Sequence, residues 1–173
     1  MGYSAKAVAN AFLDIAVANE KKLSPLKLQK LVYIAHGWNL AINDKPLIDD
    51  EFAEAWQYGP VFPSIYHEFK EFGKTPVLWK AAEYEMGEDF EFKVFNPEIP
   101  NDDEDTWKLL NRVWDIYGKY SGITLSDVTH RPDTPWSKTW AESGGRKNAD
   151  IPNDMIKAHY EELAKTRQSK AAS

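Results

Sequence analysis

The segment Ser24 to Ile42, SPLKLQKLVYIAHGWNLAI, carries the clearest structural signal in the chain. A serine followed by a proline is a typical helix start, because the serine caps a free N–H and proline has no N–H to leave unpaired. Gly37 costs about 1 kcal/mol relative to alanine, so we expect another backbone to approach there. The apolar residues recur at helical spacing and predict a core helix with one buried stripe: Leu28, Leu31, Val32, Ala35, Trp38 and Ile42.

The next segment, Glu54 to Gly73, reads EAWQYGPVFPSIYHEFKEFG and holds two prolines, two glycines and six aromatic residues. We expect a short strand ending near Trp56, a turn at Gly59-Pro60, and a helix that starts at Ser64 and ends at Gly73. We call residues 56–66 the aromatic bend. Because prolines limit the entropy that a turn loses on docking, such a bend suits protein recognition.

Weaker signals place the other elements. Ser4 caps a first helix, an acidic run at 101–107 begins a helix that ends at Gly118, and Thr124 opens a short helical turn with Asp127 as its capping-box partner. Residues 90–95 alternate in the manner of a half-buried strand, and residues 131–136 form a turn. A last helix runs from Pro152 to about Lys165.

These patterns predict an α+β fold that is mainly α-helical with a small antiparallel β-sheet. The chain has 173 residues, the size of one compact domain, which we place at residues 1–165, followed by a frayed tail at 166–173.

Composition excludes several classes of protein. The net charge is -6 and the pI about 5.3, which disfavours nonspecific binding to nucleic acid. The absence of cysteine excludes disulfides and thiolate chemistry. The N-terminus does not resemble a signal peptide, and no segment has the roughly 20 apolar residues of a membrane span, so we expect a cytoplasmic protein.

The sequence gives little support for catalysis. The four histidines, His36, His67, His130 and His159, do not sit at metal-binding spacing. No GxSxG elbow or phosphate-binding loop occurs. We therefore predict no catalytic site, no cofactor and no metal.

His130 is the most distinctive single residue, because it follows a capped turn and precedes a proline-stiffened segment ending in Trp136. It is either a polar group held at a site by a rigid loop or a histidine that bonds backbone groups beneath a tryptophan. The residues themselves favour the second interpretation.

The aromatic bend has three interpretations: a purely structural turn, a surface for another protein, and a platform for single-stranded bases. Base stacking needs a cationic groove, but the segment has no Lys or Arg before Lys70. Protein binding is therefore the favoured function. The predicted partner-binding residues are Trp56, Tyr58, Phe62, Tyr66, His130 and Trp136.

Three blocks of this sequence together resemble the Panacea domain, also met as SocA-like antitoxins and as phage-associated proteins. The first block is LKLQKLVYIAHGW at 26–38, followed by Lys45-Pro46-Leu47 and Trp56. The second is YGPVFPSIY at 58–66, and the third is LSDVTHRPDTPW at 125–136. The segment from about Val77 to Asn96 carries no recognisable signature, so features specific to one partner are expected there.

The resemblance implies an antitoxin that neutralises a cognate protein toxin by direct binding, on a shared scaffold whose variable surface supplies specificity. Two alternatives remain: a proteolytic adaptor that delivers the toxin to an energy-dependent protease, and a small enzyme centred on His130 with Asp127 or Asp133. A DNA-binding autorepressor is disfavoured by the acidic balance of charges. We expect no nucleic-acid or membrane partner.

Overall fold

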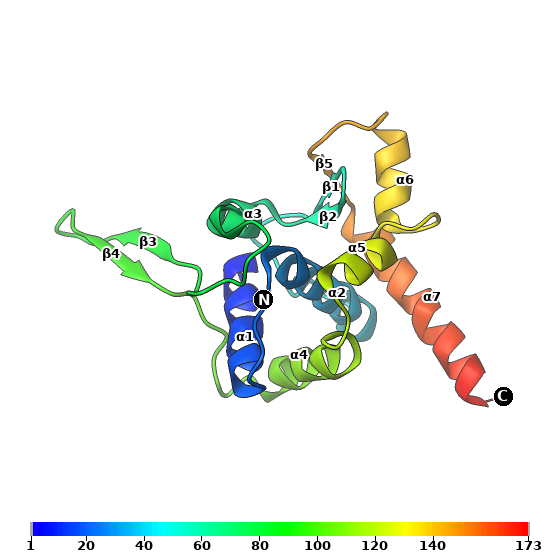
Figure 1. Ribbon diagram of the computed structural model, residues 1–173, viewed down its shortest axis with the longest axis horizontal. Coiled ribbons are helices and arrows are strands. Elements are labelled where there is room, and N and C mark those ends of the chain that lie inside the picture. The colour runs from blue at the N-terminus through cyan, green and yellow to red at the C-terminus, as the bar shows by residue number, and fades with distance from the viewer. Residues whose placement is uncertain (1, 173) are drawn as a thin grey trace.

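The computed structural model describes the backbone of residues 2–172 and the side chains of residues 2–168. The described residues form seven α-helices, one 3-10 helix and five short strands (Figure 1). In chain order they are α1 (Ala5–Ala18), α2 (Pro25–Asn43), β1 (Glu54–Trp56), β2 (Gly59–Val61), α3 (Pro63–Phe69), η1 (Lys70–Phe72), β3 (Glu83–Met86), β4 (Phe92–Phe95), α4 (Glu104–Tyr117), α5 (Gly122–Thr129), α6 (Pro135–Glu142), β5 (Ala149–Asp150) and α7 (Asn153–Ala172). The predicted class, mainly helical α+β, is confirmed.

Helix α2 is the centre of the fold and packs against α1, α4, α5 and α7. Ser24 caps it by accepting a hydrogen bond from the Lys27 N–H, with Pro25 at the first position, as predicted. The helix is buried on nearly all sides rather than on one stripe. Ile42 lies in the last turn, where the following residues are also exposed, and its own side chain is 64% exposed. Its predicted burial is therefore wrong.

Gly37 marks the closest approach to α2. A Cβ at this position would lie 2.2 Å from Cε2 of Tyr160, so the ring of that tyrosine on α7 occupies the space. The predicted close neighbour exists, but it is an aromatic ring and not a backbone.

Strand β1 lies between β2 and β5 in a small antiparallel sheet, with Glu54 paired to Val61 and to Asp150. The turn from β1 to β2 ends at Gly59, whose φ of +117° is costly for any residue with a Cβ. Helix α3 then begins at Pro63, before the predicted Ser64, because a proline is favoured at the first helical position. Ser64 lies inside the helix, and its N–H and hydroxyl donate to the Glu51 carboxylate.

Caps decide where the later helices begin. Ser121 accepts from the Thr124 N–H and starts α5, so the predicted start at Thr124 is wrong. Thr134 forms a capping box with Ser137 ahead of Pro135, so a helix, α6, begins where a turn was predicted. This Thr-Pro pair repeats the cap-then-proline signal of α2.

Helix α7 continues past the predicted domain boundary at Lys165. Arg167 Nη2 donates to Tyr117 Oη at 2.8 Å, and its guanidinium lies 5.1 Å from the Trp38 ring centroid. This part of the predicted tail therefore packs on the fold, whereas fraying of the last residues stays a prediction.

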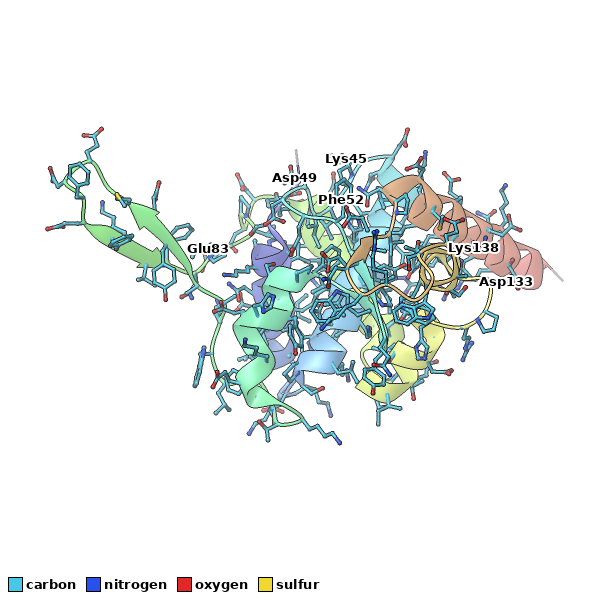
Figure 2. The ribbon with its side chains drawn as sticks, turned by 90° about the horizontal axis from the view of Figure 1, so that it is seen from above. Lys45, Asp49, Phe52, Glu83, Asp133 and Lys138 are labelled. Atoms are coloured by element: carbon cyan, nitrogen blue, oxygen red, sulfur yellow. The ribbon has the colours of Figure 1, made fainter. Side chains whose placement is uncertain are left out.

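The hairpin formed by β3 and β4 projects away from the helical body (Figure 1), with Glu83 at its base (Figure 2). Tyr84 faces Val94 and Met86 faces Phe92 across the two strands, so these apolar side chains share one face of the hairpin. All four are exposed. A strand is present at 92–95, but its predicted half-burial is wrong because no other layer covers the hairpin within the part of the chain that is described.

Candidate partner-binding groove

A groove of about 610 Å³ opens beside the aromatic bend. Its walls come from the start of α2, the β1–β2 turn, α3 with η1, and the end of α6 with the loop that follows. We call it the bend groove, and its lining is mainly apolar and aromatic: Pro25, Leu26, Gln29, Lys30, Trp56, Gln57, Tyr58, Val61, Ile65, Tyr66, Lys70, Gly73, Trp140, Gly145 and Lys147.

Four side chains from three helices hold the backbone of the bend. Each donates to a backbone carbonyl oxygen, and the four acceptors are alternate residues of the bend, from Trp56 to Phe62. The bonds are Trp136 Nε1 to Trp56 O (2.6 Å), Ser126 Oγ to Tyr58 O (2.7 Å), Lys30 Nζ to Pro60 O (2.7 Å) and Gln29 Nε2 to Phe62 O (2.9 Å).

Gln29 also accepts from the Phe62 N–H at 3.0 Å, so its amide pairs with both backbone groups of that residue. These donors and acceptors are buried or half-buried, where an unpaired polar group costs about 1–3 kcal/mol. The bend is thus fixed in one conformation by its surroundings. The donors belong to separate blocks of the recognised pattern, near residues 29–30 and near residues 126–136.

The side chains that the bend presents to the groove are aromatic. Trp56 and Tyr66 pack edge to face with ring centroids 4.7 Å apart, and Lys147 Nζ lies 4.4 Å from the Trp56 ring centroid. Trp56 is half-buried and its indole N–H donates to Glu54, while Tyr58 is 72% and Tyr66 41% exposed. These three residues offer accessible aromatic surface.

The other three predicted site residues lie behind this surface. Phe62 is fully buried, and Trp136 is buried with its indole N–H on the bend. His130 stands edge to face on Trp136 at 5.3 Å between centroids, and its Nδ1 bonds the Ser126 carbonyl. In this arrangement these side chains brace the bend, which is the interpretation of His130 that the sequence favoured.

Within the described part of the chain, no hydrogen bond or ion pair joins His130 to a carboxylate. Asp127 instead pairs with Arg131 at 3.0 Å. The His130 ring is held by a backbone carbonyl and a tryptophan. Among the described residues no group of three or more His, Cys, Asp or Glu side chains could hold a metal ion.

His36, by contrast, lies deep in the core. Its Nε2 is 2.9 Å from Asn153 Oδ1, and its Nδ1 accepts from the Ile48 N–H at 3.2 Å. Burial lowers the pKa of this imidazole, so it serves as a neutral hydrogen-bonding group within the fold.

Sequence reasoning missed Lys30. Its side chain is 1% exposed and forms part of the groove floor, and burial lowers the pKa of its ammonium to about 7. None of the ion pairs among the described side chains involves it. The one signal in the sequence was its place between Leu28 and Leu31 on the predicted core helix, which hydropathy alone does not convert into burial of a lysine.

No described helix combines the length and the apolar character needed to cross a bilayer. Two comparisons with known proteins point to the same family. The model described as "Antitoxin SocA-like, Panacea domain" matches residues 28–137. Antitoxin SocA of Caulobacter vibrioides (strain NA1000 / CB15N) is 36% identical over 132 residues, which cover 76% of this chain and 68% of that protein.

No solved structure gives a significant match. The matched segment of the family model contains the aromatic bend and the side chains that hold it, from Gln29 to Trp136. The resemblance noted in the sequence is thereby confirmed. The chain belongs to the SocA-like antitoxin family that carries the Panacea domain.

Proposed function

We propose that this protein is an antitoxin that neutralises a cognate protein toxin by binding it directly, in the cytoplasm and without catalysis. The family membership supports the antitoxin role. The proposed contact surface is the bend groove, with Trp56, Tyr58 and Tyr66 as the residues that touch the toxin. Phe62, His130 and Trp136 take part by holding that surface in place.

One observation carries the choice of this surface: the aromatic bend is already fixed before any partner arrives. Its carbonyl oxygens are bound by side chains of α2, α5 and α6. Binding therefore pays little for ordering the backbone, and Trp and Tyr are the residue types that most often dominate protein interfaces.

The test uses the protein encoded beside this gene that is toxic when expressed alone. The Trp56→Ala/Tyr66→Ala variant is predicted to weaken the toxin's binding about a hundredfold and to lose rescue of growth. The comparison variant is Tyr84→Ala/Phe92→Ala, which removes two exposed aromatic residues from the hairpin, the second surface on which partner contacts are expected. Both variants are first shown to be folded by their circular dichroism and melting temperature.

Three outcomes are distinct. Loss of binding in the groove variant, alone or together with a smaller loss in the hairpin variant, supports the proposal. Loss in the hairpin variant alone removes the groove as the contact surface but keeps the antitoxin role. Failure of the unaltered protein to rescue growth from any neighbouring toxic gene removes the antitoxin role itself.

Occlusion of the toxin also has to be separated from delivery to a protease, since both begin with binding. If occlusion is the mechanism, the half-life of the toxin is the same with and without this protein. A half-life that shortens only in its presence identifies a proteolytic adaptor instead.

A further inference from the structure

The bend groove is positively charged in an otherwise acidic protein. Its lining includes Lys30, Lys70 and Lys147 and, within the part of the chain that the structure describes, no Asp or Glu. The whole chain has 27 acidic and 21 basic residues. Two carboxylates that contact the bend are already bonded: Glu54 accepts from the Trp56 indole, and Glu51 accepts from the Ser64 N–H and hydroxyl. The groove is therefore basic although the chain as a whole is acidic.

Lys30 is the unusual member of this set. Its buried ammonium has three donors, and the one hydrogen bond it makes among the described residues goes to Pro60 O. A buried charge without a counter-charge is costly, and lysines are almost never fully buried unless paired. If the only task were to hold the Pro60 carbonyl, a neutral donor would suffice. Lys70 and Lys147 are exposed and stand at the same groove.

We propose that the groove binds an extended polypeptide segment of the partner that carries a carboxylate beside an apolar or aromatic residue. The carboxylate pairs with Lys30, supported by Lys147, while the apolar side chain packs on Trp56 and Tyr66. That the partner is a toxin rests on the proposed function, whereas the chemistry of the bound segment is inferred from the groove itself. The inference adds which part of a toxin the groove recognises.

The electrostatic argument favours an acidic occupant. In a partly dehydrated groove, an opposite charge a few ångströms away is worth more than at an open surface. Pairing also keeps Lys30 in its protonated form, which burial alone disfavours. Among the described residues, the other charged side chains that line the groove are those of Lys70 and Lys147, and they add no negative charge.

Nucleic acid is a poorer occupant than a peptide. It too would bring negative charge and flat rings to an aromatic cationic groove. A backbone of phosphates, however, needs an extended basic surface, and the net charge of -6 opposes its approach.

The experiment needs no toxin. Short random peptides displayed on phage are selected against the whole protein and, in parallel, against Lys30→Met. We expect the first selection to enrich Asp or Glu next to an aromatic or aliphatic residue, and the second to lose the acidic preference. Lys30→Met has nearly the same length and removes a buried charge, but it leaves the Pro60 carbonyl without this donor, so its fold is first checked by circular dichroism and melting temperature.

The best peptide is then synthesised with its acidic residue intact and with the isosteric amide. The amide form is predicted to bind the unaltered protein at least about tenfold more weakly, and to bind Lys30→Met as well as the acidic form does. Lys74→Met, a lysine that does not line the groove, is the control that keeps the full acidic preference.

A lysine with a purely structural role would weaken both peptides equally in Lys30→Met, and that result overturns the proposal. Absence of any acidic preference, or displacement of the peptide by an oligothymidine that binds more tightly, also overturns it. These readouts are independent of growth rescue, so failure of the antitoxin assay leaves the peptide result standing and failure of the peptide assay leaves the antitoxin role standing.

Discussion

The aromatic bend and the β3–β4 hairpin both carry exposed aromatic side chains, yet they are held in opposite ways. The bend is tied to α2, α5 and α6 through hydrogen bonds to its own carbonyls. The hairpin is held by its two-stranded ladder and projects from the rest of the molecule (Figure 2). Its side chains Tyr84, Met86, Phe92 and Val94 are exposed. An isolated two-stranded hairpin is only marginally stable in water.

The difference suggests a division of labour. A rigid groove suits a contact whose geometry is the same for every partner of the scaffold, whereas a weakly held apolar hairpin can adapt to a particular partner. The bend lies in the recognised pattern, and the hairpin lies in the stretch for which the sequence offered no signature. Apart from a control in the bend, the variants below alter either α2, which anchors the bend, or the hairpin.

The largest effect is expected from Gln29→Leu. The substitution leaves the buried Phe62 N–H without its partner and removes one bond from the Phe62 carbonyl. We expect a loss of about 3 kcal/mol in the free energy of unfolding, measured by urea denaturation. Gln57→Leu in the same bend is exposed and should change stability by less than about 0.5 kcal/mol. Equal stability of the two variants would mean that the bend is not anchored from α2.

Lys30 makes the groove sensitive to pH. Burial lowers its pKa to about 7 from the ordinary lysine value of 10.5, so between these values the unfolded chain holds a proton that the folded protein does not. The free energy of unfolding therefore rises with pH across this interval, by about 2 kcal/mol between about pH 7 and pH 9.

Lys30→Met is predicted to remove this dependence. The free energies of unfolding of the two proteins are measured by denaturation at each pH, and their difference gives the contribution of Lys30 without that of the other titrating groups. The same slope in both proteins would show that Lys30 titrates normally and is solvated.

Gln29 is a buried polar residue whose amide is hydrogen-bonded, and Tyr33 provides the opposite case. Its hydroxyl is buried without a hydrogen-bond partner among the described residues, and burial raises its pKa. Tyr33→Phe is therefore predicted to raise the free energy of unfolding by about 1 kcal/mol, in contrast to Gln29→Leu. A lower melting temperature for this variant would show that the hydroxyl is bonded in solution.

The smallest effect is expected in the hairpin. Replacing Tyr84, Met86, Phe92 and Val94 by Thr keeps the strand propensity and removes the exposed apolar face. Global stability should change by less than about 0.5 kcal/mol, because the face contributes little to the core. A loss as large as that of Gln29→Leu would show that the hairpin packs on the body in solution.

Sequence patterns predicted the elements whose signals are local. The caps at Ser4, Ser24 and the acidic start of α4 are where periodicity and capping chemistry placed them. The errors arose where two local signals competed. Ser121 and Thr124 are both capping residues, and only the backbone conformation of Ser121 decided between them. The sequence could not predict the exposed hairpin, because alternation at 90–95 does not say whether a second layer exists.

The candidate site was predictable only in part. Aromatic composition pointed to the bend, but it could not separate the accessible Tyr58 and Tyr66 from the buried Phe62. The bracing bonds join residues that are between 30 and 80 positions apart in the chain, so no local pattern encodes them. Lys30 was missed because hydropathy alone places a lysine at the surface.

Hydrogen–deuterium exchange of this protein with and without its toxin tests the central claim most directly. The account predicts that binding slows exchange in residues 56–66 and in the loop at 143–148, at least as much as in the hairpin at 83–95. Slowed exchange confined to the hairpin, with the bend unchanged, would contradict it.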